Sequence, residues 1–124
     1  MEFEKAEDVR LMAEKINERF QLKLDLSKVA FIRSHGSKSR AIARTLMLPS
    51  QWRFVLSPST IYIVEVLSEK FDKLSCEEKA YVILHELTHI PTAMKGGLRN
   101  HDHPNFKKLR KTPQKELSEV CKQI

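Results

Sequence analysis

The pentapeptide His85-Glu86-Leu87-Thr88-His89 combines the residue types of a zinc site at a spacing that a helix can use. Side chains four residues apart lie nearly one above the other on a helix, so His85 and His89 can direct imidazole nitrogens at one ion. Glu86 lies about 100° further round the helix and can flank the metal as a general base. From there it can take a proton from a water whose pKa the zinc has lowered to about 7. The motif predicts a zinc-dependent hydrolase with Glu86 as its catalytic residue.

A catalytic zinc needs a third protein ligand and an open coordination position. The extended motif with a glycine and a third histidine is excluded, because Thr92 and Lys95 stand at those positions. His101 and His103 follow a Gly96-Gly97 turn that lets the chain fold back toward the helix. We prefer His101 as the third ligand, with His103 as the next candidate, on the ligand preferences of zinc. Two carboxylates of the C-terminal segment are further alternatives: Glu116 and Glu119.

The element that presents the motif has clear signals at both ends. Ser75 followed three residues later by Glu78 is a capping-box pattern, so we expect a helix to begin at Cys76. Pro91 should end it near Ile90, because the residue before proline is disfavoured in the α region. An apolar stripe lies opposite the histidines and should bury the helix against a sheet: Ala80, Ile83, Leu84 and Leu87.

The rest of the chain predicts an α+β domain. Residues 6–20 carry apolar side chains at helical spacing, and residues 28–33 fit a buried strand. Gln51–Leu56 and Ile61–Leu67 are rich in aromatic and β-branched residues, which indicates an antiparallel strand pair joined by a short turn. If Ile61–Leu67 lies at the sheet edge, it could pair with an extended peptide substrate. The other expected elements are a short helix or basic loop at 38–47 and short helices at 105–111 and 114–123.

The net charge of +6 is unevenly distributed. Residues 95–115 hold seven Lys or Arg against one Asp, and residues 33–53 hold five Lys or Arg and no acid. If the two segments converge on one face, they would favour nucleic acid or an acidic protein partner. A solvated basic surface is the simpler explanation. No stretch has the roughly 18 apolar residues that predict a membrane span.

The two cysteines, Cys76 and Cys121, match no metal-ligand spacing. We expect both to be reduced thiols without a role. The acidic, amphipathic N-terminus lacks the pattern of a secretory signal, so a cytoplasmic location is expected.

The stretch from Tyr62 to Phe106 resembles a family of phage and archaeal metallopeptidases. They belong to the zincin-like group, which also includes the SprT-like and WLM zinc proteases. The matching segments are IYIVEV, FDKLSCEEK, HELTHIP and LRNHDHPNF, and FIRSHGSKSRAIAR matches less specifically. HELTHIP with a downstream His-Asp-x-x-x-Phe is the specific core of the resemblance.

The resemblance implies a single zincin-like metallopeptidase domain over residues 1–124. Its compact α+β fold would pack a small, mostly antiparallel sheet against the N-terminal helix and the His-Glu-x-x-His helix. In the family pattern the third zinc ligand is the histidine before the aspartate, here His101, which joins His85 and His89. The expected activity is intracellular cleavage of peptide bonds by Glu86-assisted attack of water. The alternative is a nucleic-acid-associated module in which zinc is structural, or a protease that its basic segments direct to DNA-bound proteins.

Overall fold

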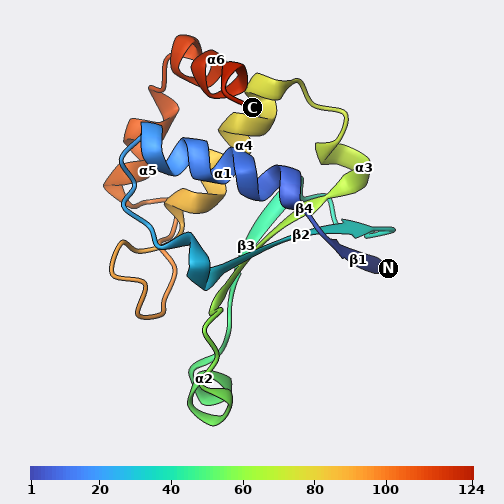
Figure 1. Cartoon of the computed structure of the whole chain (residues 1–124), viewed down its shortest axis with the longest axis vertical. Coiled ribbons are helices and arrows are strands. Elements are labelled where there is room, and N and C mark those ends of the chain that lie inside the picture. The colour runs from blue at the N-terminus through green and yellow to red at the C-terminus, as the bar shows by residue number, and fades with distance from the viewer.

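The computed structural model describes residues 1–124, which form a four-stranded sheet covered on one face by helices (Figure 1). The strands are β1 (Glu2–Lys5), β2 (Val29–His35), β3 (Ala43–Met47) and β4 (Tyr62–Leu67). A short 3₁₀ turn, η1 (Leu26–Lys28), precedes β2. The helices are α1 (Glu7–Arg19), α2 (Ser50–Leu56), α3 (Ser68–Phe71), α4 (Cys76–Thr88), α5 (Pro104–Arg110) and α6 (Gln114–Lys122). None of them is long and apolar enough to cross a membrane.

The sheet is mixed, with strand order β1-β2-β4-β3. The outer pairings β1–β2 and β3–β4 are antiparallel, whereas the central pair β2–β4 is parallel. The prediction of a mostly antiparallel sheet therefore holds for the outer pairings only. Strand β4 lies in the interior, so Ile61–Leu67 is not an edge strand that could pair with a substrate. The edge on that side is β3.

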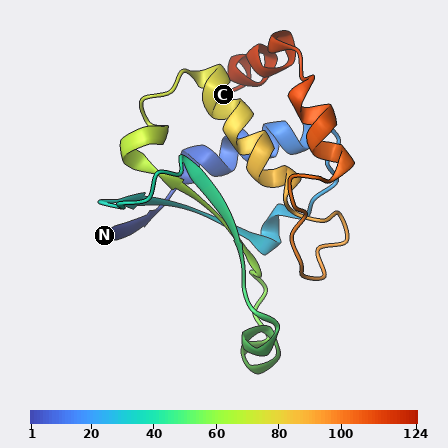
Figure 2. The same cartoon turned by 180° about the vertical axis from the view of Figure 1, so that it is seen from behind.

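Helices α1 and α4 pack on one face of the sheet (Figures 1 and 2). The stripe predicted on α1 is buried as expected, with Val9, Met12, Ala13 and Ile16 in the core. Every second residue of β4 faces these helices, and Tyr62, Val64 and Val66 are fully buried. The α+β class and the two helices against the sheet are confirmed.

The chain between β2 and β4 differs from the prediction. Gln51–Leu56 is not a strand but part of helix α2, at the tip of an arm formed by β3 and β4 (Figures 1 and 2). The second strand of the arm is β3, in the segment where a short helix or basic loop was expected. The physical reason is that β4 already has neighbours on both sides, β2 and β3, so residues 51–56 have no strand to pair with.

Cys76 and Cys121 form a disulfide, so the expectation of two reduced thiols is wrong. Cys76 opens α4 and Cys121 lies in the last turn of α6, and these two helices pack together. Their separation of 45 residues along the chain gave no sign that the fold brings them within 6.0 Å, measured between Cα atoms. The bridge ties the C-terminal helix to the start of the helix that carries His85.

Reducing this disulfide is expected to destabilise the protein without unfolding it. A bridge that closes a 45-residue loop stabilises the native state by about 2–4 kcal/mol, mainly by restricting the unfolded chain. Thermal melts with and without dithiothreitol should therefore differ by roughly 8–15 °C in Tm. The double variant Cys76→Ser, Cys121→Ser is the control, and its Tm should be low and insensitive to the reductant. Equal Tm values for the oxidised and reduced wild type would contradict the prediction.

Candidate metal centre

Helix α4 begins and ends where the sequence places it. The Ser75 hydroxyl accepts a hydrogen bond from the backbone N–H of Glu78 at 3.2 Å, and the Glu78 carboxylate accepts one from the Ser75 N–H at 2.9 Å. The predicted stripe of Ala80, Ile83, Leu84 and Leu87 is buried. The last helical residue is Thr88, with His89 at the C-cap, so the histidine pair occupies the final turns of α4. The core thus fixes the helix on one side and leaves the histidines on the other.

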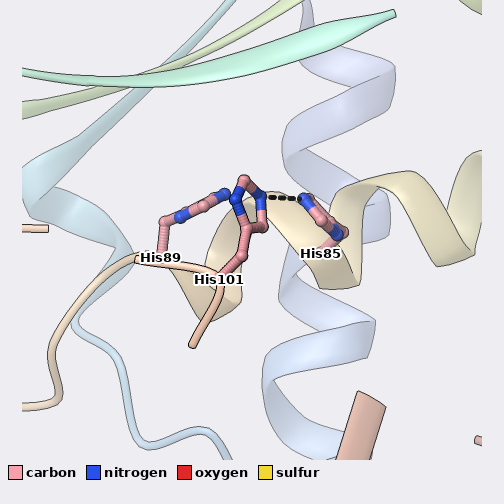
Figure 3. A group of neighbouring side chains, drawn as sticks. All are labelled: His85, His89 and His101. Atoms are coloured by element: carbon pink, nitrogen blue, oxygen red, sulfur yellow. Dashed lines mark hydrogen bonds between the residues drawn. The ribbon is translucent and has the colours of Figure 1, made fainter. Parts of the chain in front are cut away.

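His101 joins His85 and His89 in a compact group (Figure 3). One ring nitrogen from each histidine lies within 4.8 Å of the other two. The Nε2 atoms of His85 and His101 are 3.1 Å apart and face each other. Two neutral imidazoles that meet through lone pairs repel, so this contact needs either a proton or a cation between the nitrogens. Three imidazoles at this separation are a typical donor set for zinc.

The loop that delivers His101 is anchored to the end of α4. The Arg99 N–H donates to the His89 carbonyl at 2.7 Å, and the Arg99 carbonyl accepts from the Nδ1 of His89, also at 2.7 Å. The second bond places the proton of a neutral His89 on Nδ1, which leaves the Nε2 lone pair free for a metal. Gly96 and Gly97 have φ values of +106° and +79°, which L side chains rarely adopt, so the predicted turn does depend on glycine.

Phe106 forms the apolar support of the histidine group. Its ring centroid lies 5.2 Å from that of His85, 4.7 Å from His89 and 5.1 Å from His101, and its side chain is buried. It projects from α5, directly after the loop that carries His101. A bulky ring in contact with all three imidazoles restricts their rotamers, which pre-organises the group.

Glu86 is buried beside the histidines and hydrogen-bonded to the sheet. The Thr45 hydroxyl lies 2.9 Å from Glu86 Oε1 and 3.0 Å from the Glu86 carbonyl oxygen. The other carboxylate oxygen, Oε2, is 4.0 Å from His85 Nε2. Burial raises the pKa of Glu86, while the bond from Thr45 opposes that shift. A carboxylate with a raised pKa in a cleft is suited to proton transfer near neutral pH.

An open cleft runs between β3 and the loop at residues 98–101. Its lining includes Glu86 and all three histidines of the group, His85, His89 and His101. The other lining residues come from β3 (Ala43, Arg44 and Thr45) and from the loop (Leu98, Arg99 and Asn100). The histidine group is therefore accessible to a substrate that lies along β3.

The family model described as putative phage metallopeptidase matches residues 1–123. The chain belongs to this family. No curated protein and no solved structure matches it significantly. Membership in a phage metallopeptidase family and a group of three histidines together indicate a metal-dependent protease.

The other ligand candidates of this phage metallopeptidase chain lie outside the histidine group. His103 caps α5, where its Nδ1 accepts a hydrogen bond from the Asn105 N–H at 3.1 Å. Glu116 pairs with Arg19 and Glu119 with Lys122 on α6, which packs near the opposite end of α4. Of the four candidates for a third ligand, only His101 lies beside His85 and His89.

Two residues that contact Glu86 and the histidine group are not predicted from the sequence. Thr45 holds Glu86, and the Arg99 carbonyl holds His89. A threonine within a basic segment and a backbone carbonyl carry no pattern that distinguishes them. The FIRSHGSKSRAIAR segment, which ends just before Thr45, belongs only to the less specific part of the family resemblance.

Acidification is expected to destabilise the metal-free protein through His85. Burial, followed by the nearby His89 and His101, lowers the pKa of His85 from 6.5 to about 4. The unfolded chain therefore binds more protons between these values, and the free energy of unfolding falls as pH drops from 6.5 toward 4. Above pH 4.5, the ordinary pKa of a glutamate, the raised pKa of Glu86 makes the free energy of unfolding rise as pH drops. The contribution of His85 is therefore measured by comparing the wild type with a variant that lacks this histidine.

Urea titrations in chelator at pH 6.5 and 4.5 provide that comparison for wild type and His85→Asn. The wild type should lose more free energy of unfolding between the two pH values than the variant does. Equal losses would show that protonation of His85 is not linked to folding.

Proposed function

We propose that this protein is a zinc-dependent peptidase of the zincin-like type, with His85, His89 and His101 as ligands and Glu86 as general base. The observation that carries the proposal is the group of three histidine nitrogens within 4.8 Å of one another, beside a buried carboxylate. Metallopeptidase family membership supports the same reaction class.

The residues present fit a zinc ion. The site offers three neutral nitrogen donors, a lone pair on His89 Nε2 directed by the Arg99 carbonyl, and a close contact between His85 and His101 that a cation would relieve. Three protein ligands with an open position are typical of catalytic zinc, whereas structural sites are usually closed by four. His103, which could have completed a closed site, caps α5 instead.

Each side chain then has a separate task. Zinc held by the three histidines would polarise the scissile carbonyl and make a water acidic enough to ionise near pH 7. Glu86 removes the proton from the attacking water and delivers it to the leaving amine. Thr45 keeps the Glu86 carboxylate turned toward the histidines by donating to Oε1. The Arg99 carbonyl and the Phe106 ring hold the imidazoles in place.

Strand β3 is the surface on which an extended peptide would lie. It pairs with β4 on one side only, and its other edge borders the cleft. Leu48 and Ile61 form a hydrogen-bonded pair between β3 and β4. In an antiparallel ladder, hydrogen-bonded pairs alternate with pairs that form no hydrogen bonds to each other. Ala43, Thr45 and Met47 are in the second kind of pair, so their backbone N–H and C=O groups point to the free edge of β3. A peptide added there would pass directly over Glu86.

The nucleic-acid alternative stays a prediction. In the first basic segment, Arg33 pairs with Asp8 and Asp72, and Arg44 pairs with the buried Glu65. These pairs neutralise two of the five cations of residues 33–53, and the seven cations of residues 95–115 form no ion pairs. Salt-dependent retention on DNA, lost when Lys107, Lys108, Arg110 and Lys111 are neutralised, would support this alternative.

A cytoplasmic location stays a prediction. Disulfides are rare in the reducing cytosol, so the Cys76–Cys121 bridge makes the location directly testable. Intact cells are lysed in acid, which traps the thiols, and the protein is then treated with a thiol reagent. If the chain resides in the cytosol, both cysteines should be modified.

The test of the proposed function is peptide cleavage by the purified, metal-loaded protein. A library of quenched fluorescent peptides should be cleaved, cleavage should stop in chelator, and zinc should restore it. Metal analysis should give a single zinc ion per chain. Zinc binding without any cleavage, and with slow water exchange, would instead indicate a structural site.

A further inference from the structure

Helix α2 exposes a group of large apolar side chains. Phe54 is 86% exposed, Val55 71%, Leu56 58% and Trp52 56%. They occupy four of the seven positions of the helix, and none of them is buried in the core. Single exposed apolar residues are ordinary, but a contiguous set at one tip indicates a binding surface. We call these four residues the tip cluster.

The tip cluster is held in a fixed position relative to the cleft. Arg53 lies on the one side of α2 that faces the protein, where Nε donates to the Leu48 carbonyl at 3.1 Å and Nη1 to the Lys95 carbonyl at 3.1 Å. Gly96 permits this contact, because a Cβ there would lie 2.7 Å from the guanidinium. The Tyr62 hydroxyl donates to the Gly97 carbonyl at 3.3 Å and accepts from the Gly96 N–H at 3.1 Å. Helix α2 is thus fastened to the loop that ends at Leu98 in the cleft wall.

The free edge of β3 leads from the cleft to the tip cluster. Thr45 touches Glu86 in the middle of the strand, and β3 continues through Met47 before α2 begins at Ser50. At about 3.3 Å per residue, a bound peptide strand would reach α2 roughly four to six residues from the scissile bond. Strand β3 leads to α2 from one of its two ends only (Figure 2). The tip cluster on α2 would therefore contact a bound substrate on one side of the scissile bond and not on the other.

We propose that the tip cluster is an exosite for an apolar segment of the polypeptide substrate, on one side of the scissile bond. This inference rests on the proposed peptidase function. It assigns the substrate class as extended, unfolded polypeptide that carries aromatic or aliphatic residues about five positions from the cleavage site. Folded proteins bury such residues, so the exosite favours unfolded chains.

The geometry favours a polypeptide over a bilayer or a second copy of this chain. At about 100° per residue, positions 52, 54, 55 and 56 spread over about 200° of the circumference of α2, on the side away from Arg53. This arc is broader than the single flat face that an interfacial helix presents to a membrane. The cluster also follows β3 directly along the chain, and the free edge of β3 is where a peptide substrate would lie.

The first experiment measures binding without turnover. Trp52 is the only tryptophan in the chain, so its emission reports on the tip cluster alone. In the Glu86→Gln background, peptides of about twelve residues should shift the emission to the blue when an apolar block lies on one side of their centre. The same block on the other side, or a Ser/Gly block, should leave the emission unchanged. Phe54→Ser should weaken the response about tenfold, as expected when an aromatic anchor is removed.

The second experiment measures cleavage. Trp52→Ser with Phe54→Ser should raise KM about tenfold for the preferred peptide and leave kcat unchanged, because these residues bind substrate away from the reacting atoms. A short peptide that spans only the cleft should be cleaved equally by variant and wild type. Phe3→Ser is the matched control, since Phe3 is 57% exposed on β1 at the opposite edge of the sheet.

The outcomes separate the two proposals. If no peptide is cleaved but the tryptophan shift follows the apolar block, the tip cluster stands as a polypeptide-binding surface and the peptidase assignment fails. If KM depends neither on the apolar block nor on the substitutions in the tip cluster, the exosite proposal is wrong. A blue shift with phosphatidylserine vesicles alone would assign the cluster to a membrane. A concentration-dependent dimer that Phe54→Ser dissolves would assign it to self-association. Either result overturns the exosite.

Discussion

Glu86→Gln is expected to lower kcat by about 10²–10⁴-fold while zinc remains bound, since this is the usual contribution of a positioned general base. Glutamine has nearly the same shape, and its amide oxygen can still accept the hydrogen bond that Thr45 donates to Oε1. An amide cannot take a proton from the attacking water, so only the chemical step is affected. The measurements are kcat at saturating substrate and zinc content by mass spectrometry.

Thr45→Val is the control for Glu86→Gln, because it should give a smaller loss of kcat through the same carboxylate. It retains the carboxylate and removes the hydroxyl that orients it, so we expect a loss of roughly 10-fold, the value of one hydrogen bond to a charged group. A Glu86→Gln variant that keeps more than about a tenth of wild-type kcat would exclude proton transfer by Glu86. Loss of zinc from that variant would mean that Glu86 acts on the metal site and not on the water.

The helix that carries the site could be predicted because its determinants are local. Ser75 and Glu78 cap it, its apolar stripe repeats at helical spacing, and Pro91 follows its last turn. Each of these signals lies within a few residues of the structure it sets. The motif histidines needed only helix geometry to be placed on the face away from the stripe.

Strand β4 could be predicted from its own residues, but the other two elements of the arm, β3 and α2, could not, because they depend on which strands pair with β4. Residues 51–56 have a strand-like composition but form α2, since β4 is already paired on both sides. Strand β3, which supplies Thr45, was missed for the same reason: a basic segment shows its strand character only once β4 lies beside it. The Cys76–Cys121 bridge likewise depends on how α6 packs against α4.

His101→Ala is expected to lower zinc affinity by more than 100-fold, and His103→Ala to leave it nearly unchanged. Removal of a residue that only orients a ligand costs about 10- to 100-fold, so a larger loss marks a ligand. The two histidines are neighbours on one loop, yet His101 Nε2 lies 3.1 Å from His85 Nε2 while His103 caps α5. His103→Ala should therefore cost about 1 kcal/mol of folding stability and no affinity.

Competition with a chromophoric chelator measures both zinc affinities, and the rise in Tm on adding zinc checks them independently. At zinc concentrations about 100 times Kd, bound zinc should stabilise the wild type and His103→Ala by about 2.7 kcal/mol. The same zinc should leave the Tm of His101→Ala almost unchanged. Unaltered affinity in His101→Ala would shift the search to Glu116 and Glu119. Because both are ion-paired on α6, binding through either would require α6 to leave the start of α4, to which the Cys76–Cys121 bridge holds it. Compared with Glu116 and Glu119, His101 can therefore bind zinc without any rearrangement of the fold.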